Sequence, residues 1–114
     1  MAFSELELEL IDKEVGGLCR ERNRPEFKDE LSIIYRVDKQ DVFIFEKRPA
    51  YQRPNEYVET PAAKLKYVKT KNEWRLFWMR GDLKWYAYKP VKDSVKLKDL
   101  VSEIRTDPYG CFWG

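Results

Sequence analysis

The chain has 114 residues, of which 43% are hydrophobic and 37% charged, and its formal net charge is +2. This composition is typical of one folded domain over residues 1–114 and excludes a disordered chain. The apolar runs are strand-length, far below the roughly 20 residues that cross a bilayer, and the acidic start lacks the pattern of a secretory signal. We therefore expect a single cytoplasmic domain with no membrane contact.

The first predicted element is a helix over about residues 5–22. Ser4 and Glu7 have the spacing of a capping box, in which each side chain accepts a hydrogen bond from the other residue's backbone N–H. Apolar side chains then recur at helical spacing and predict a stripe facing the core: Leu6, Leu10, Ile11, Val15 and Leu18. Arg24-Pro25 is expected to end the helix, because proline does not continue it.

Two strands are predicted next, over residues 31–37 and 42–48, because both runs are rich in β-branched and aromatic side chains. The polar tetrapeptide from Asp38 to Asp41 between them indicates a hairpin. Residues 49–61 contain three prolines, Pro49, Pro54 and Pro61. We expect this segment to be a long surface loop.

Three more strands are predicted at about residues 63–70, 73–80 and 83–89, joined by two-residue turns at Lys71-Asn72 and, as type II′, at Gly81-Asp82. These turns determine which side chains share a face. The expected core face holds Leu65, Tyr67, Trp74, Leu76, Trp78, Trp85 and Ala87. The expected opposite face holds Lys64, Lys66, Val68, Arg75, Phe77, Met79, Lys84, Tyr86 and Tyr88.

A second helix is predicted after Pro90, capped by Asp93 or Ser94 and ending before Asp107-Pro108. Its apolar stripe consists of Leu97, Leu100, Val101 and Ile104. The apolar tail over residues 109–114 is expected to pack on the domain or on a partner, including a second copy of the chain. The predicted fold class is therefore α+β, an antiparallel five-stranded β-meander with an N-terminal and a C-terminal helix.

Several motifs of this sequence resemble a family of small bacterial proteins defined only as a domain of unknown function. They include Lys47-Arg-Pro49, Pro61-Ala-Ala-Lys64, Tyr67-Val-Lys-Thr70, Asp82-Leu-Lys-Trp85 and the closing Gly110-Cys-Phe-Trp-Gly114. The resemblance covers most of the chain and implies a bacterial origin, but no activity. Relatives often have histidine at the position of Tyr86, and the difference counts against a required catalytic imidazole.

The chemistry available to the chain is limited by its residue types. The sequence contains no histidine, which removes the commonest general base and the usual Ser-His and Cys-His pairs. Its two cysteines, Cys19 and Cys111, cannot by themselves complete a structural zinc site. We expect both to be reduced structural thiols, and we expect no metal and no cofactor.

The main functional hypothesis is a non-enzymatic binding domain that uses a basic, aromatic sheet face. The candidate residues are Lys64, Lys66, Arg75, Phe77, Lys84, Tyr86 and Tyr88. Aromatic rings on a sheet can stack bases while lysines and arginines hold phosphates, so single-stranded nucleic acid is one expected partner. The other is a protein, which includes a second copy of the chain that pairs through this face. In the competing interpretation, the N-terminal helix covers or flanks this face and the lysine stems only shield a two-sided core.

An alternative hypothesis is a small enzyme or a small-anion-binding protein with its site at the proline-containing segment 49–61. Its candidate residues are Arg48, Tyr51, Arg53, Arg80 and Asp82. Arginines that converge on one place can bind a carboxylate or a phosphate. The simpler interpretation is that Arg80 and Asp82 form a surface ion pair across the turn.

Overall fold

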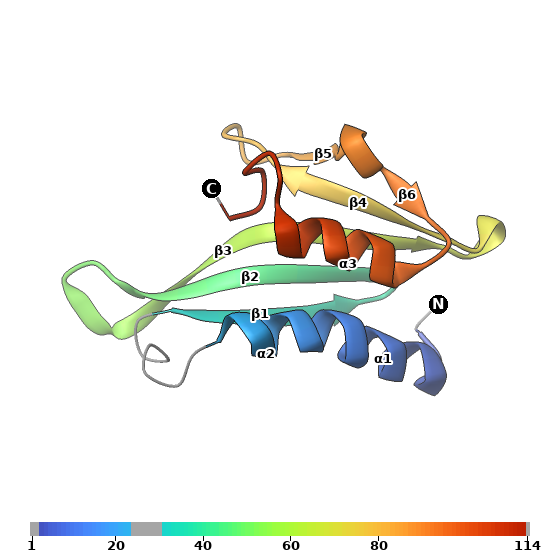
Figure 1. Ribbon diagram of the computed structural model, residues 1–114. Helices are drawn as coiled ribbons and strands as arrows, with labels where there is room; N and C mark the ends of the chain where they lie inside the picture. Colours follow the sequence, from blue (N-terminus) through green and yellow to red (C-terminus); the bar gives the residue numbers. More distant parts are fainter. Residues whose placement is uncertain (1–2, 24–30, 114) are drawn as a thin grey trace.

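The computed structural model describes residues 3–23 and 31–113. Five strands follow one another as an antiparallel meander: β1 Ser32–Asp38, β2 Asp41–Ala50, β3 Arg53–Val68, β4 Glu73–Met79 and β5 Trp85–Ala87. A two-residue strand, β6 Asp93–Ser94, pairs with β4 beyond β5. Figure 1 shows the N-terminal helix and the C-terminal helix α3 side by side over the same face of this sheet. The predicted α+β meander with a helix at each end is confirmed.

The N-terminal helix begins at the predicted capping box. Ser4 accepts from the Glu7 N–H at 3.2 Å, and the Glu7 carboxylate accepts from the Ser4 N–H at 2.8 Å. The helix consists of α1 Glu5–Ile11, a π-helical segment Asp12–Gly16 and α2 Gly17–Arg22. The predicted end at Arg24-Pro25 lies outside the described residues.

Part of the predicted stripe on this helix is wrong. Ile11, Val15 and Leu18 are fully buried, but Leu6 is 78% exposed and Leu10 is 42% exposed. In Figure 1, α1 runs past the end of β1, and it contributes Ile11 to the core. The π-helical segment also rotates the residues before it relative to those after it. Helical spacing alone could show neither effect.

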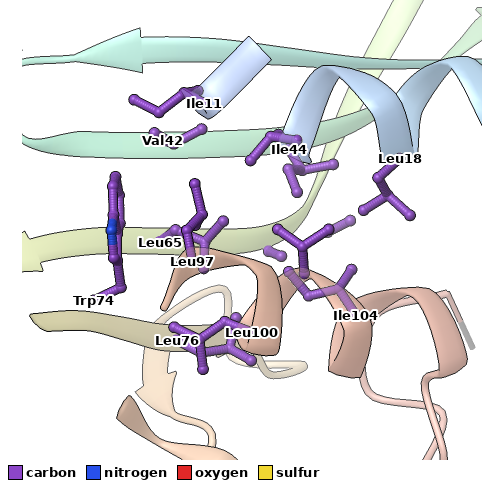
Figure 2. Packing of buried hydrophobic residues seen from close by; sticks show 14 of the residues in the cluster. Ile11, Leu18, Val42, Ile44, Leu65, Trp74, Leu76, Leu97, Leu100 and Ile104 are labelled. Atoms are coloured by element: carbon purple, nitrogen blue, oxygen red, sulfur yellow. The ribbon is translucent and has the colours of Figure 1, made fainter. Parts of the chain in front are cut away.

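The core lies between the two helices and one face of the sheet (Figure 2). The whole predicted stripe of α3, Leu97–Thr106, is buried: Leu97, Leu100, Val101 and Ile104. These side chains meet Val42, Ile44, Leu65, Trp74 and Leu76 from the strands. Each buried CH₂ group contributes roughly 0.8 kcal/mol to stability. This apolar layer is therefore the main source of stability of the fold.

The segment 49–61 forms a hairpin instead of the predicted long loop. β2 continues to Ala50 and β3 starts at Arg53, so only Tyr51 and Gln52 lie between them. Pro49 pairs with Tyr57, and Pro61 pairs with Phe45 next to an irregularity in the register. Proline lacks an N–H but is tolerated where the ladder has an edge or a bulge. The prolines are therefore accommodated within the ribbon.

The β3–β4 connection differs from the prediction but leaves the predicted faces of these strands correct. The chain makes a 3₁₀ turn over Lys69–Lys71 and passes through Asn72 with φ 48°. Leu65 consequently pairs with Leu76. This register differs from the predicted one by an even number of residues, so no side chain changes face. Leu65, Trp74 and Leu76 are buried as predicted.

The predicted type II′ turn at Gly81-Asp82 is wrong. The Leu83 N–H donates to the Arg80 carbonyl at 2.9 Å, and Leu83 has φ 64°, which adds a third residue to the loop. One added residue inverts the strand that follows. Trp85 and Ala87 therefore face away from the helices.

The C-terminal part differs from the prediction at the start of α3 and agrees with it at the end. Asp93 and Ser94 form β6, and Lys96 precedes the helix without a side-chain cap, so neither predicted N-cap is used. The helix ends at Thr106, before Asp107-Pro108. Phe112 in the following tail is buried, so the tail packs on the domain.

Candidate functional site

The candidate site is the face of the sheet that lies opposite the helices, here called the open face. Directly paired residues of antiparallel strands point to the same side, so the pairing identifies its members. Arg36 pairs with Phe43, Phe43 with Lys64 and Lys64 with Phe77. The central part of the open face consists of Ile34, Arg36, Phe43, Phe45, Lys64, Lys66, Arg75, Phe77, Met79 and Trp85.

The aromatic rings of the open face gather around one lysine. The ring centroid of Phe43 lies 6.3 Å from that of Phe45 and 6.0 Å from that of Trp85. The Lys64 Nζ lies 5.6 Å from the Phe43 centroid and 5.4 Å from the Phe77 centroid. Since β2 and β5 are separated by β3 and β4, the contact between Phe43 and Trp85 indicates that the sheet curls toward this face. The rings remain half-buried.

Two arginines of the open face are engaged by carboxylates. Arg36 donates to both oxygens of Glu59, at 2.7 and 2.6 Å, and its guanidinium lies 5.3 Å from the Phe45 ring centroid. This bidentate bond lowers the pKa of Glu59 and raises that of Arg36. Arg75 pairs with Glu73 at 3.7 Å. Both arginines are therefore partly neutralised.

Four lysines on or beside the open face keep their charge uncompensated. Across residues 3–23 and 31–113, no ion pair within 4.0 Å involves Lys64, Lys66, Lys71 or Lys92. Lys71 and Lys92 line a hollow of about 400 Å³ at the edge of the face, together with Arg75, Phe77 and Ala87. Glu73 and Asp93 lie in the same wall. The local charge is thus mixed, with lysine as the unpaired component.

The predicted binding residues fall into two groups. Lys64, Lys66, Arg75 and Phe77 lie together on the open face. Lys84 lies in the β4–β5 connection, while Tyr86 and Tyr88 point to the helix side, because the three-residue loop inverts β5.

Tyr88 shows clearly how far this inversion moves a side chain. Its side chain is completely buried, and its hydroxyl donates to Glu103 at 2.9 Å. Burial, followed by that hydrogen bond, raises the pKa of Tyr88. Tyr88 is therefore a core residue that cannot contact a partner on the open face.

The alternative set of residues does not form one site. Arg48, Tyr51 and Arg53 lie at or near the tip of the β2–β3 hairpin, whereas Arg80 and Asp82 lie at the β4–β5 connection, and Figure 1 shows the two places well apart. Arg48 pairs with Glu46 at 3.0 Å, and Arg53 pairs with Glu56 at 3.5 Å.

Sequence reasoning missed Phe43, Phe45, Trp85 and Arg36. A usable signal was present in Val42-Phe-Ile-Phe45, where aliphatic and aromatic residues alternate with the period of a strand. Val42 and Ile44 are fully buried, and the phenylalanines lie on the other side. Trp85 had no comparable signal, because its face depends on the length of the preceding loop.

Both cysteines are free thiols. Burial raises the pKa of Cys19 to about 11 and also raises the pKa of Cys111. Neither is therefore a thiolate at neutral pH, which is the form that a nucleophile needs. Within the described part of the chain, no three acidic, cysteine or histidine side chains come together as a metal site requires.

Residues 3–114 match a family described as a domain of unknown function, DUF3024. The chain belongs to the DUF3024 family. This confirms the membership in an uncharacterised family that the sequence motifs predicted. The chain matches no curated protein and no solved structure. None of the described helices of this DUF3024 domain is long and apolar enough to cross a membrane.

Proposed function

We propose that the protein is a non-enzymatic binding domain that holds single-stranded nucleic acid on its open face. The observation that supports this most directly is the ring cluster of Phe43, Phe77 and Trp85 around Lys64, on a sheet face that neither helix covers. Every base has a π-face, so rings of this kind bind a strand without a particular sequence. The sequence preference is therefore expected to be weak.

The lysines supply the second part of the interaction. Lys64 and Lys66 lie two residues apart on β3 and therefore on the same face. Lys71 and Lys92 line the hollow beside Phe77. A phosphate chain that crosses β3 and β4 meets these charges in turn. Each neutralised phosphate releases a counterion, and four contacts give a slope of about −3 in log affinity against log salt.

The curl of the sheet supports a strand more than a duplex. A concave face a few strands wide suits one flexible chain, whereas a duplex needs a helix or ribbon that enters a groove. The paired arginines add to the case, because Arg36 and Arg75 can exchange a carboxylate for a phosphate at modest cost in an exposed setting. The carboxylates of Glu59 and Glu73 oppose the same phosphate, so the affinity is expected to be moderate.

Titration of fluorescently labelled DNA and RNA single strands at low salt tests the proposal. We expect saturable anisotropy changes that weaken as salt rises. The variant Phe77→Leu keeps an apolar side chain but removes the ring, and the loss is expected to be about 1–3 kcal/mol if one base is unstacked. The double variant Lys64→Gln, Lys66→Gln is expected to reduce the salt slope by about 1.4.

A matched control is available on the opposite side of the molecule. Lys96 and Lys98 have the same spacing as Lys64 and Lys66 but lie at α3, where both are exposed. Their double change to glutamine removes the same charge and is expected to leave binding almost unaltered. If the two double variants lost the same amount of binding affinity, net charge alone would explain the effect, and a specific binding face would be rejected.

The absence of binding at high micromolar protein would reject nucleic acid as the partner. In that case, capture of a protein by the wild-type chain, lost in Phe77→Leu, would assign the open face to a protein interface. Aromatic and arginine side chains are common in both kinds of surface. Circular dichroism of each variant establishes that the fold is intact.

A further inference from the structure

A second hollow, of about 580 Å³, lies on the helix side of the sheet, between the β4–β5 connection and the C-terminal tail. Its lining is mostly apolar and includes Trp78, Tyr86, Tyr88, Tyr109 and Cys111, together with the cations Arg80 and Lys89. A hollow of this size is in the range that holds a small organic molecule. Ala87 lines both this hollow and the one at the edge of the open face, but among the described residues the two share no aromatic or charged residue.

The tail wall of this hollow is held by specific contacts. Asp107, with φ 41°, accepts hydrogen bonds from the backbone N–H groups of Phe112 at 3.2 Å and Trp113 at 2.9 Å. The Trp113 indole donates to the Ile104 carbonyl at 2.8 Å, and the Phe112 ring lies 4.9 Å from that of Tyr88. The tail therefore forms an ordered side of the hollow, because these contacts attach it to α3 and to the core.

Arg80 is placed to offer its charge to a ligand. Its guanidinium lies 5.6 Å from the Trp78 ring centroid and 4.9 Å from that of Tyr86. Within the described residues it has no carboxylate within 4.0 Å, so the ion pair with Asp82 expected from the sequence does not form. A guanidinium stacked on rings keeps its N–H fork available for a carboxylate.

The nearby negative groups are already engaged. Asp82 accepts from the Tyr86 hydroxyl and from the Lys84 N–H at 3.1 Å. Glu103 accepts from Tyr88, and Asp107 accepts from the tail. The raised pKa values of Cys111 and Tyr88 keep the thiol and the phenol neutral. The lining thus presents rings and two cations, Arg80 and Lys89, and no carboxylate from the part of the chain that the structure describes.

We propose that this hollow binds a small molecule that consists of an apolar, ring-sized body and one carboxylate. The body packs against Trp78, Tyr86 and Tyr109, and the carboxylate accepts from the Arg80 fork. Burial of the body drives binding, and the two parallel N–H bonds select the charged group over a neutral one of the same shape. The nucleic-acid proposal for the open face does not depend on this site.

Titration with 2-naphthoate, followed by ¹H–¹⁵N NMR, tests the inference. We expect saturable shifts of the Trp78 indole and of the Tyr109 and Cys111 amides, with a dissociation constant of about 1 mM or tighter. The neutral isostere 2-naphthamide is expected to bind at least about tenfold more weakly. Arg80→Gln is expected to reduce this difference, with Lys89 the cation that remains in the lining, and to leave the affinity for 2-naphthamide unchanged.

Arg75→Gln is the matched control, because it makes the same change on the open face of β4, whereas Arg80 directly follows β4 and lines the hollow. It is expected to preserve the preference for 2-naphthoate. Three results would overturn the inference: no shifts at millimolar 2-naphthoate, equal binding of the two compounds, or shifts at Phe43 and Phe77 in place of Trp78. Oligonucleotide binding by Arg80→Gln, measured in parallel, keeps the failure of one site distinct from the failure of the other.

Discussion

The two faces of β4 use neighbouring residues in opposite ways. Leu76 and Trp74 point to the helices and are almost completely buried, whereas Arg75 and Phe77 point to the open face and stay partly exposed. The covered face is shielded from solvent because two helices pack over it. On the open face, rings and cationic side chains lie close to one another, and neither helix covers them. The comparison teaches that strand alternation here separates a layer that stabilises the fold from a surface that no helix covers.

The largest expected effect contrasts two adjacent positions. Leu76→Ala leaves a cavity in the sealed layer and should lower the free energy of unfolding by about 2–5 kcal/mol. Phe77→Ala removes a half-buried ring from the open face and should cost about 1 kcal/mol. Urea unfolding of both variants measures the difference. Similar losses would show that the open face is covered in solution, for example by a second copy of the chain.

A pH titration tests how well the covered face excludes water. Burial raises the pKa of Cys19 from an ordinary value of 9.0 to about 11 in the folded chain, so the folded state holds the thiol proton more tightly than the unfolded state does. The protonated Cys19 thiol makes its full contribution to the free energy of unfolding below pH 9, and this contribution is lost as pH rises through 11. The free energy of unfolding falls by roughly 2–3 kcal/mol at most.

Two tyrosines contribute to the same loss at high pH. Burial raises the pKa of Tyr35 to about 12 and also raises that of Tyr88. The free energy of unfolding of the wild-type chain should therefore fall between pH 9 and 11. That of Cys19→Ala should fall by a smaller amount over the same range. Unfolding curves at several pH values measure both slopes. Identical slopes would mean that water reaches the thiol.

The tail extends the covered face, and Asp107→Asn tests its attachment. Asparagine tolerates the left-handed backbone at this position but offers one acceptor oxygen to the two N–H groups of the tail. We expect a loss of about 1 kcal/mol in the free energy of unfolding. Faster amide exchange at Phe112 and Trp113, with α3 still protected, should accompany it. Unchanged exchange would contradict the role assigned to Asp107.

The smallest effect is expected from the Arg36–Glu59 pair on the open face. Exposed ion pairs contribute little and are screened by salt. Arg36→Gln should therefore lower stability by less than any change above, and the difference from wild type should shrink when salt is raised to about 0.5 M. A loss as large as that of Leu76→Ala would mean that this pair is sealed from water.

Much of the covered layer could be predicted, and the composition of the open face only in part. The stripe Leu97, Leu100, Val101 and Ile104 follows from helical spacing and is entirely buried. Leu6 and Leu10 have comparable spacing but are exposed, because α1 runs past the end of β1 and its helical turns are out of phase with those after the π-helical segment. Lys64, Lys66, Arg75 and Phe77 were assigned to the right face, and Tyr86 and Tyr88 to the wrong one. One residue of loop length made the difference.

By itself, the sequence determined the order of the elements, the capping box at Ser4, the buried stripe of α3 and the absence of imidazole chemistry, since all of these depend on local pattern or residue type. Only the tertiary structure decided that Leu83 adopts φ 64° and inverts β5, and that the prolines of segment 49–61 lie within a hairpin. Register and strand continuation depend on partners distant in sequence. Local propensity does not specify register or strand continuation, and both candidate binding surfaces depend on these two properties.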